Sequence, residues 1–455
     1  MSISNYEYII VGGGPAGMQL GYFFEKNKID YMILEKNATW GSFFLKYPRH
    51  GMMISINKKN TGSDDPDYNL KHDWNSLLSD DSLRFTDYTD EYYPQTSLYH
   101  KYLNDFGRKN KLKCNFGTEI TEIKKVEDTF VLTSVNKIYH CKQLIIATGL
   151  STPYIPDIEG KEHCLQYSDM SLDKTVYKNK NILIVGKGNS GFETANYLTD
   201  TAKRIHMINR GEHRNAYQTH YVGDVRSVNG SFFDTHQLKS DNFLYNLDIQ
   251  LCKILKTSEG RLRLREKGER DHYFRNLFQE DYDEIIFCTG WKFDNGIFSE
   301  DTKPHSGKYP AITGEFESVN ISNLYFIGSL GHSLDYRISS GGFIHGFRYL
   351  VKAFYSILMS KTKKISWPKE TLEIPESRYK LISRMNQSSA LYQMYGQLVD
   401  LMVLNNFNNI DYLEDVPIFY VTTLMKNNKY FGNTEKHMYL IYTLSLEFGL
   451  CEGFN

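Results

Sequence analysis

YIIVGGGPAG, residues 8–17, is the stretch that decides the fold, and ILIVGKGNSG repeats its pattern at residues 182–191. Each stretch has an apolar run suited to a buried parallel strand, followed by the glycine pattern G-x-G-x-x-G. A segment with helical character comes next, from Met18 to Lys26 in the first case and from Phe192 to Leu198 in the second. Such a turn presents backbone N–H groups and the positive end of a helix to a phosphate. The two stretches therefore predict two Rossmann-like units, each binding a dinucleotide.

The glycines of this pattern have separate roles. Gly12 permits the tight turn off the strand, Gly14 lets the backbone approach the pyrophosphate, and Gly17 lets the helix pack closely on the strand. One such pattern often marks only a glycine-rich turn, whereas two with suitable neighbours are a much stronger signal. We expect dinucleotide contacts from Gly12, Gly14, Pro15, Ala16 and Gly17 in the first turn, and from Gly186, Gly188, Ser190 and Gly191 in the second.

The residues that end the next strand of each unit differ in charge. Tyr31 to Leu34 is followed by Glu35 and Lys36, whereas Arg204 to Ile208 leads to Arg210. A carboxylate there accepts hydrogen bonds from a ribose diol, and a guanidinium suits a 2′-phosphate. We therefore predict an unphosphorylated adenine dinucleotide in the first unit and NADPH in the second. An arginine at a strand end is also a common surface feature, and other cations are alternatives for the phosphate contact: Lys187, Arg204, His213 and Arg214.

Three later apolar runs end in glycine, at Leu144 to Gly149, Glu284 to Gly290 and Leu324 to Gly328. Turns of this kind let the backbone pass close to a bound cofactor. They favour a flavoprotein that binds two nucleotides. The cofactor contacts expected here are Thr148, Gly149, Thr289, Gly290 and Gly328.

Composition excludes several function classes. The net charge of −1, with both signs interspersed, gives no reason to expect nucleic acid or an anionic membrane as a partner. No apolar run approaches the length of a membrane span, and the chain enters its first strand too early for a signal peptide. The 6 cysteines have neither CxxC nor metal-ligand spacing. We therefore expect reduced thiols, no metal and a cytoplasmic protein.

The predicted fold class is α/β, with two dinucleotide-binding, Rossmann-like domains, the second inserted in the first, and a helical C-terminal extension. Residues 1–165 and 289–358 would bind FAD, and residues 166–288 would bind NADPH. Residues 377–455 are rich in Met, Leu and Tyr and are expected to be helical. We expect them to cap the active site or to form a subunit contact in a homodimer, with ordinary packing as the simpler explanation.

The paired glycine patterns, the variant GNSGFE at residues 188–193 and the Thr-Gly turns resemble flavin-containing monooxygenases. Residues 47–58, 69–78 and 336–349 are similar to the FAD-dependent oxidoreductase domain-containing protein 2 group. Bacterial relatives include N-oxygenating enzymes that act on amino acids, such as those that make nitrosuccinate from aspartate. The resemblance implies an NADPH- and O2-dependent FAD monooxygenase that N-oxygenates a small polar amine or amino acid through a C4a-(hydro)peroxyflavin.

The chain departs from these families in three ways. The motif FxGxxxHxxxF/Y of many such monooxygenases is degenerate at residues 158–167, one residue short between Gly160 and His163. Ser329 follows Gly328 where thioredoxin-reductase-like proteins have an aspartate. A relative in the endoplasmic reticulum would need a signal peptide and a retention tail, and we expect neither here.

The resemblance also suggests catalytic residues. Asn57 falls where the monooxygenases place an asparagine near flavin C4a, and an amide can donate to an oxygen adduct without changing the flavin's charge. Capping a turn before Lys58 and Lys59 is an equal alternative for Asn57. Lys58 is a second candidate that could instead be solvated, and Asn189 could help to hold the nicotinamide half.

Two further segments are expected at the flavin ring. His72, Trp74 and Asn75 would pack against the ring or line its pocket, although a tryptophan in a polar frame is more often a core residue. Gly341 and Gly342 would open a helix whose free N–H groups face the flavin pyrimidine oxygen.

Three arginines, Arg49, Arg337 and Arg348, are the candidates to anchor a substrate carboxylate, because a guanidinium binds a carboxylate with two hydrogen bonds. Each is individually more common as a structural ion-pair partner.

Two other functions stay open. One is an NADPH-dependent flavin oxidoreductase that passes electrons to a disulfide or protein partner, against which the missing CxxC counts. The other is a non-catalytic flavin-binding partner module.

Overall fold

The structure is a computed structural model that describes residues 2–232, 243–268, 275–404, 408–427 and 441–446. The chain forms two units. Unit 1 comprises residues 1–45, 55–150 and 293–455, and unit 2 comprises residues 46–54 and 151–292. The chain therefore passes between the units four times, because the short segment 46–54 belongs to unit 2. The assignment of FAD and NADPH to these units stays a prediction. The domain boundaries proposed from the sequence also stay a prediction.

Unit 1 is built on a sheet whose first strand, β1 (Ser2–Val11), pairs in parallel with both β2 and β6. The order is β3-β2-β1-β6-β5-β4, with β16 also paired to β6. The remaining strands are β2 (Tyr31–Leu34), β3 (Cys114–Asn115), β4 (Ile120–Val126), β5 (Thr129–Ser134), β6 (Lys137–Ile146) and β16 (Leu324–Phe326). The main helices of the sheet region and its connections are α1 (Pro15–Lys26), α2 (Pro66–Leu70), α3 (Thr96–Lys109) and α8 (Ile344–Lys363).

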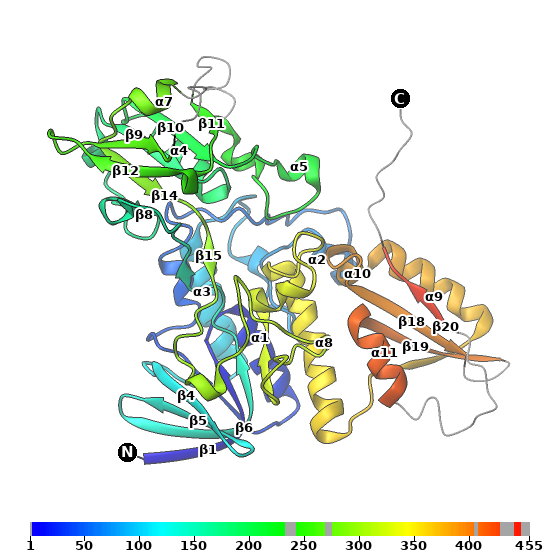
Figure 1. The fold of residues 1–455 in the computed structure, drawn as a ribbon. Helices are drawn as coiled ribbons and strands as arrows, with labels where there is room; N and C mark the ends of the chain where they lie inside the picture. Colours follow the sequence, from blue (N-terminus) through cyan, green and yellow to red (C-terminus); the bar gives the residue numbers. More distant parts are fainter. Residues whose placement is uncertain (1, 233–242, 269–274, 405–407, 428–440, 447–455) are drawn as a thin grey trace. The chain divides into compact units, whose positions relative to one another are not determined.

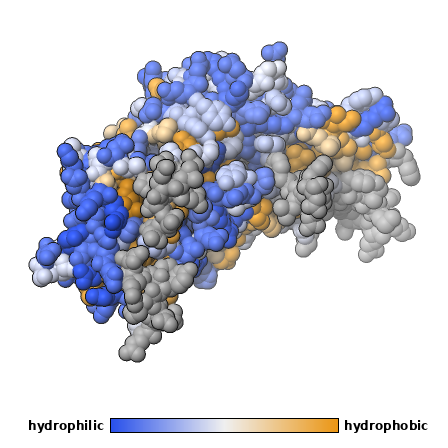
Figure 2. Space-filling model, turned by 90° about the horizontal axis from the view of Figure 1, so that it is seen from above, coloured by the Kyte–Doolittle hydropathy of each residue, from blue (hydrophilic) through white to orange (hydrophobic). Residues whose placement is uncertain are grey.

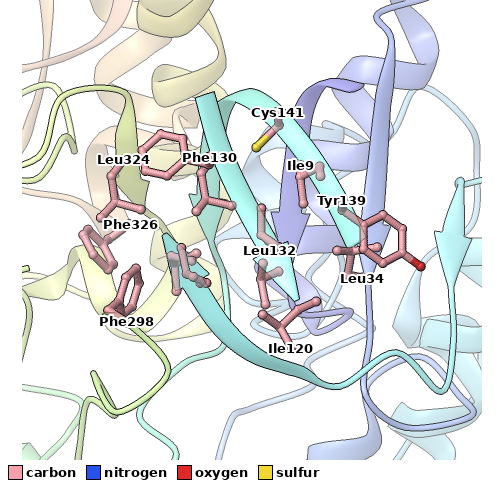
Figure 3. Close-up of a cluster of buried hydrophobic side chains, with 14 of the residues drawn as sticks. Ile9, Leu34, Ile120, Phe130, Leu132, Tyr139, Cys141, Phe298, Leu324 and Phe326 are labelled. Atoms are coloured by element: carbon pink, nitrogen blue, oxygen red, sulfur yellow. The ribbon is translucent and has the colours of Figure 1, made fainter. Parts of the chain in front are cut away.

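The core of unit 1 explains why strands far apart in the sequence share a sheet. Side chains from β1, β2, β4, β5, β6 and β16 gather with Phe298 in one buried cluster (Figure 3). Ile9, Leu132 and Leu144 are fully shielded from solvent. Burying a side chain of this size stabilises the fold by roughly 1.5–3 kcal/mol, so this cluster fixes the register that brings the strand ends to one edge.

Unit 2 contains a five-stranded sheet of order β11-β10-β9-β14-β8, and every pairing in it is parallel. Its strands are β8 (Leu165–Gln166), β9 (Asn181–Val185), β10 (Arg204–Asn209), β11 (Leu244–Asn246) and β14 (Glu284–Phe287). The shorter elements are α4 (Asn189–Leu198), α5 (Ala216–Thr219), α7 (Arg275–Gln279), the hairpin β12 (Cys252–Lys256) and β13 (Leu262–Glu266), and the ribbon β7 (Thr152–Pro153) and β15 (Trp291–Lys292). The predicted α/β fold with two Rossmann-like sheets is confirmed.

The helical expectation for residues 377–455 is wrong for much of the described part. Three helices occur, α9 (Ile374–Gln387), α10 (Ser389–Gln393) and α11 (Ile418–Asn427), but they accompany an antiparallel sheet of order β17-β19-β18-β20 (Figure 1). Its strands are β17 (Glu370–Glu373), β18 (Leu398–Leu404), β19 (Asn409–Pro417) and β20 (Ile441–Leu444). The run LVDLMVL of β18 is buried along nearly its whole length, and periodicity alone cannot separate such a strand from a buried helix. Residues 405–407, 428–440 and 447–455 lie outside the described ranges.

A buried charge cluster joins these C-terminal elements. The guanidinium of Arg384 in α9 donates to Asp400 in β18 and to Asp415 in β19, both at 2.6 Å. Tyr412 also donates to Asp400 at 2.9 Å, and Lys352 of α8 contacts Asp415 at 2.9 Å. Burial alone would raise the pKa of Asp415, but the charges of Lys352 and Arg384 outweigh it and hold that pKa below its usual value. The cluster therefore ties the C-terminal sheet to α8.

The face of the molecule in Figure 2 is mostly hydrophilic, with apolar areas between the polar ones. Among the helices of the described ranges, none has the length and apolar character needed to cross a membrane.

We predict that Arg384→Met lowers the free energy of unfolding by about 3–5 kcal/mol, because it leaves the buried carboxylate of Asp400 without its cation and takes one of two cations from Asp415. Urea unfolding followed by circular dichroism measures the change. Arg378→Met, on the exposed side of the same helix, should stay within about 0.5 kcal/mol of the parent. Equal effects of the two substitutions would contradict a special role for the cluster.

Candidate functional site

The turn after β1 has the geometry of a dinucleotide cradle. Gly12 donates to the carbonyl of Leu34 at 2.9 Å and has φ +114°, and a Cβ there would lie 2.7 Å from the carbonyl oxygen of Ala147. By contrast, no atom lies within 4 Å of the position that a Cβ on Gly14 would take. Gly14 caps α1 without a side-chain hydrogen bond, and the first turn of α1 has no acidic residue. The N–H groups of this helix end are therefore open to an anion.

Glu35 lies beside this turn at the end of β2 and is 6% exposed. Its Oε2 accepts from the N–H of Gly13 at 2.7 Å, and its Oε1 accepts from the N–H of Asn37 at 2.9 Å. Oε1 also accepts from the Nδ2 of Asn37 at 3.0 Å and from the hydroxyl of Ser42 at 3.3 Å, so it is fully occupied. These bonds fix the carboxylate next to the phosphate turn, and Oε2, with one donor, has a lone pair left for a ribose hydroxyl. Lys36 is exposed and contributes no hydrogen bond to this arrangement.

The structure brings the other predicted glycine turns of unit 1 to the same edge of the sheet. Ala147 donates to Val11 at 2.8 Å, which places Thr148 and Gly149 directly beyond the neighbouring strand. Gly328 follows β16, and its Cβ would lie 2.6 Å from that of Ala16. The backbone at these turns can therefore approach a nucleotide held by the cradle.

A second part of unit 1 pairs two segments that the sequence analysis named separately. Asn57 and Asp73 form an isolated antiparallel bridge, and Lys58 donates to the carbonyl of His72 at 3.1 Å. Trp74 donates through its backbone to Ile56 at 3.2 Å. Residues 56–58 and 72–74 therefore form one structural pair.

In the side-chain amide of Asn57, the oxygen is available to a ligand and the NH2 group is not. The side chain is 1% exposed, and its Nδ2 donates to the carbonyls of Thr89 at 2.9 Å and Glu91 at 3.3 Å. Its Oδ1 is buried and has no hydrogen-bond partner among the described residues. Asn57 therefore offers an acceptor, whereas the resemblance to the monooxygenases predicts a donor. A buried acceptor without a partner costs about 1–3 kcal/mol, which a ligand N–H would recover.

The neighbours of Asn57 divide into buried and exposed groups. Lys58 is exposed, which agrees with the alternative in which its ammonium group is solvated. The amide of Asn75 is occupied, since it donates to Ile56 at 3.1 Å and accepts from Ser55 at 2.5 Å. His72 is half-buried, and burial together with nearby lysines lowers the pKa of its imidazole. The Trp74 ring stacks on His345 with centroids 4.1 Å apart.

Gly341 and Gly342 are packed against a buried pair that the sequence analysis missed. His332 contacts Asp335 through Nδ1 at 2.9 Å, and Ser339 donates to the same carboxylate. A Cβ on Gly341 would lie 2.6 Å from Asp335, and one on Gly342 would lie 2.7 Å from His332. A histidine and an aspartate three residues apart, shortly after a cofactor-turn glycine, are the sequence signal that could have found this pair.

The three arginines proposed for a substrate carboxylate do not form one site. Arg348 is fully buried, and its guanidinium donates to the carbonyls of Leu70, Asp73 and Ser76 at distances of 2.7–3.0 Å. It holds the 70–76 segment instead of facing a ligand. Arg337 is exposed in unit 1. Arg49 lies in unit 2, where its guanidinium donates to the carbonyl of Met170 at 2.5 Å.

Unit 2 repeats the cradle with the same geometry. Gly186 has φ +123° and donates to the carbonyl of Ile208 at 2.8 Å, and a Cβ there would collide with the carbonyl of Cys288. Gly188 caps α4 without a side-chain hydrogen bond, and no atom lies within 4 Å of its Cβ position. The N-terminus of α4 is therefore as open to an anion as that of α1.

Register identifies the counterpart of Glu35 in unit 2. Val11 pairs with Leu34, and Val185 pairs with Ile208, so Asn209 occupies the position of Glu35 and the exposed Arg210 follows it. The second cradle therefore has no carboxylate at the ribose position and has a guanidinium one residue later.

Two of the four alternative cations for the phosphate contact, Lys187 and Arg204, are engaged elsewhere, whereas His213 and Arg214 follow Arg210 between β10 and α5 and stay open as alternatives. Lys187 is 5% exposed, its Nζ donates to Asn246 at 2.5 Å, and burial lowers the pKa of its ammonium group to about 8. Arg204 begins β10 and pairs with Glu280 at 2.6 Å. Because phosphates bind beyond the carboxyl ends of the strands, these positions favour Arg210 over Lys187 and Arg204.

Asn189 is fully occupied by its own unit. Its Nδ2 donates to the carbonyls of Gly223 and Asp224, and its Oδ1 accepts from Arg226 and Asn229, at distances of 2.8–3.2 Å. The side chain therefore fastens α4 to residues 223–229, and we propose a positioning role for it in place of a catalytic one.

A small pocket of unit 2 lies where β14 and β8 end. It contains Ser190 together with the predicted turn residues Thr289 and Gly290, and the ring of Trp291 forms part of its wall. Tyr167, which also lines this pocket, donates to Glu193 at 2.8 Å. In an open parallel sheet, ligands bind beyond the carboxyl ends of the strands, which is where this pocket lies.

Three of the described cysteines, Cys141, Cys252 and Cys288, are buried, and Cys114 and Cys164 are half-buried. Cys114, Cys141, Cys164, Cys252 and Cys288 are all unpaired. Burial raises the pKa of each thiol, to about 12 for Cys164, Cys252 and Cys288. Thiols with raised pKa are weak nucleophiles.

Sequence comparison finds matches over most of the chain. The family described as pyridine nucleotide-disulphide oxidoreductase matches residues 9–328. The FAD-dependent oxidoreductase domain-containing protein 2 of Mus musculus is 36% identical over 476 residues, covering 97% of this chain and 70% of that protein. The senecionine N-oxygenase of Tyria jacobaeae is 22% identical over 312 residues, covering 64% of this chain and 59% of that protein.

Solved structures share the fold. A flavin-containing monooxygenase from Stenotrophomonas maltophilia aligns with a TM-score of 0.59 at 14% identity, covering 80% of this chain and 100% of that one. The bacillithiol disulfide reductase of Staphylococcus aureus aligns with a TM-score of 0.57 at 19% identity, with the same coverage. Both likenesses concern the fold alone, and it is common to oxygenases and reductases.

We predict that Gly14→Val abolishes FAD binding without unfolding the protein, and that Gly188→Val leaves FAD bound. Both positions are open in the structure and have extended backbone that valine adopts, so each new side chain would fill only the space that a phosphate needs. The measurement is the flavin content of the purified variants, with thermal unfolding of the flavin-free forms. Loss of FAD in both variants, or in neither, would contradict the assignment of one nucleotide to each cradle.

Proposed function

The chain belongs to the pyridine nucleotide-disulphide oxidoreductase family, and within it to the FAD-dependent oxidoreductase domain-containing protein 2 group; on that premise we propose that it is an NADPH- and O2-dependent FAD monooxygenase that oxygenates the nitrogen of a small polar amine or amino acid. Family membership makes the chain a flavin-dependent oxidoreductase that uses FAD and NAD(P)H. The choice of NADPH, of O2 and of a nitrogen substrate is the proposal.

The difference between two otherwise similar cradles carries the proposal. Both have an open helix N-terminus after a glycine turn, but the first has the carboxylate of Glu35 and the second has Asn209 followed by Arg210. A carboxylate suits the free ribose of FAD, and a guanidinium suits the 2′-phosphate of NADPH. One chain can therefore hold a hydride donor and a flavin acceptor at once.

The residues of unit 1 fit FAD. The N-terminus of α1 would hold the pyrophosphate, Glu35 would hold the ribose, and the turns at Gly149 and Gly328 would let the backbone pass close to the cofactor. When bound, FAD supplies hydride acceptance and oxygen activation, which side chains cannot provide. The protein's contribution is to orient the ring and to exclude water around it.

We assign the ring end of FAD to the paired segments around Asn57 and Trp74 and to the start of α8 after Gly341 and Gly342. The unpartnered Oδ1 of Asn57 is the acceptor that an N–H of the flavin or of an amine substrate would satisfy. The first turn of α8 has no acidic residue and no side-chain cap, so its N–H groups can stabilise negative charge on a ligand oxygen.

The identity of the oxidised atom rests on the relatives. The name of the senecionine N-oxygenase supports nitrogen as the site of oxygenation, and the flavin-containing monooxygenase supports O2 as the co-substrate. No arginine cluster for a substrate carboxylate forms within the described part of unit 1, so an amine fits the site at least as well as an amino acid. Exposed Arg337 remains the candidate there for a carboxylate contact.

The second candidate is an NADPH-dependent oxidoreductase that reduces a disulfide or a protein partner. The shared fold with a bacillithiol disulfide reductase favours it. The five described cysteines are unpaired, and burial raises the pKa of each thiol, which favours the monooxygenase because disulfide exchange needs a thiolate. Cys451 lies outside the described residues.

We predict that NADPH oxidation consumes O2 in step with an added amine and yields an N-oxygenated product. An oxygen electrode, a peroxide assay and mass spectrometry of the product measure the three quantities together. A monooxygenase consumes one O2 per NADPH and releases little peroxide when substrate is present. Amine-independent oxygen uptake that ends entirely in peroxide, with electrons passing readily to a disulfide, would support the reductase instead.

We predict that Arg210→Ala slows flavin reduction by NADPH about 10- to 100-fold at low nucleotide concentration and leaves NADH unaffected, because it removes a charge-assisted contact worth about 1.5–3 kcal/mol. Asn209→Glu should impair NADPH and improve NADH, since it restores the carboxylate that unit 1 has. Anaerobic rapid mixing, followed by flavin bleaching, measures both. A wild-type protein without preference for NADPH would remove the basis for this role of Arg210.

A further inference from the structure

Gln393, the last residue of α10, contacts both segments to which we assign the flavin ring. Its side-chain Nε2 donates to the carbonyl of Lys71 at 2.9 Å, and its backbone carbonyl accepts from the N–H of Ser340 at 3.2 Å. Gln393 is 4% exposed. One buried residue of the C-terminal region therefore joins the chain immediately before His72 to the chain immediately before Gly341.

Further contacts lie around the two hydrogen bonds of Gln393. The Nζ of Lys71 donates to the carbonyl of Asn386 at 2.5 Å and lies within 5.4 Å of the ring centres of Tyr68 and Tyr392. The carboxylate of Asp67 accepts from the N–H of Ser389 at 3.2 Å. The α2 segment is therefore held by the end of α9 and by α10.

The start of α8 is held from the same side. The Sδ of Met394 lies 3.8 Å from the hydroxyl of Ser339 and 2.7 Å from the position that a Cβ on Gly346 would take. Ser339 in turn donates to Asp335, against which Gly341 packs. The C-terminal region thus contacts the framework that supports the two glycines.

The hydrogen bond from Gln393 to Lys71 also affects side chains at the proposed site of the flavin ring. The carbonyl of Lys71 accepts from Gln393 and also from the Nε1 of Trp74, at 3.0 Å. A carbonyl with two donors has both lone pairs occupied, so Gln393 helps to fix the atom on which the Trp74 indole is oriented. Trp74 stacks on His345 of α8, so both segments meet there as well.

We propose that the C-terminal region is a clamp that sets the spacing of the two segments around the flavin ring, with Gln393 as its positioning residue. The proposal rests on the proposed function, because it takes these segments to line the ring. The match to the oxidoreductase family ends at residue 328, so the clamp lies in the part of the chain beyond the matched region. The buried cluster of Arg384, Asp400 and Asp415 gives it a rigid base.

The test is Gln393→Met, which keeps the length of the side chain and the backbone bond to Ser340 but removes the donor to Lys71. Gln387→Met is the matched control, since the side-chain hydrogen bond of Gln387 among the described residues is the one that its Oε1 accepts from Ser383 within α9. Each protein is reconstituted with FAD, and the visible circular dichroism of the flavin, the FAD affinity and the thermal unfolding of the flavin-free form are measured. Lys71→Met removes a second tie, the bond to Asn386, and serves if Gln393→Met does not fold.

We expect Gln393→Met to change the visible circular dichroism of the flavin and to weaken FAD binding about three- to tenfold, as expected for the loss of one buried hydrogen bond. Gln387→Met should behave as the parent. Lys71→Met should shift the flavin signal in the same direction as Gln393→Met. A lower unfolding temperature with an unchanged flavin signal and affinity would show that Gln393 is merely structural and overturn the clamp. Failure of the parent to bind FAD would instead overturn the proposed function.

Discussion

The whole arrangement depends on one steric constraint, met once in each unit. The chain leaves its first strand through a glycine, Gly12 or Gly186, at which any Cβ would strike the carbonyl of the residue that follows the neighbouring strand. Only with glycine there can the backbone turn tightly enough for the following helix to start at the strand's end. The helix N-terminus is then aimed at open space, with its N–H groups available to an anion. Everything proposed about nucleotides follows from this turn.

The constraint makes the cradles alike, and the next strand makes them different. Since both cradles pair with their second strand in the same register, Glu35 and Asn209 take equivalent places. The difference at this one position separates a site for a free ribose from a site that tolerates phosphate. The function proposed here depends on that difference, whereas the fold would be the same without it.

Much of this could be predicted from sequence because the signals are local. A strand, a glycine turn and a helix are contiguous, so the sequence predicts β2 at Tyr31–Leu34, the bounds that the structure has, and it predicts both glycine turns. The rest depends on contacts between distant residues. Hydrogen bonds to the carbonyls of residues 89 and 91 set the orientation of the Asn57 amide. Hydrogen bonds to carbonyls within residues 70–76 hold the guanidinium of Arg348 in the interior. The buried run of β18 has no periodicity that separates strand from helix, so the sequence does not predict the C-terminal sheet.

The central claim is that one chain holds two unlike nucleotides, each in its own cradle. Native mass spectrometry of the purified protein, titrated with FAD and NADP+, tests it most directly, because the oxidised nucleotide binds without turnover. The account predicts a complex of one FAD and one NADP+ per chain, in which NADP+ binds without displacing FAD and more tightly than NAD+. Displacement of FAD by NADP+, or a second FAD in place of the nicotinamide nucleotide, would contradict it.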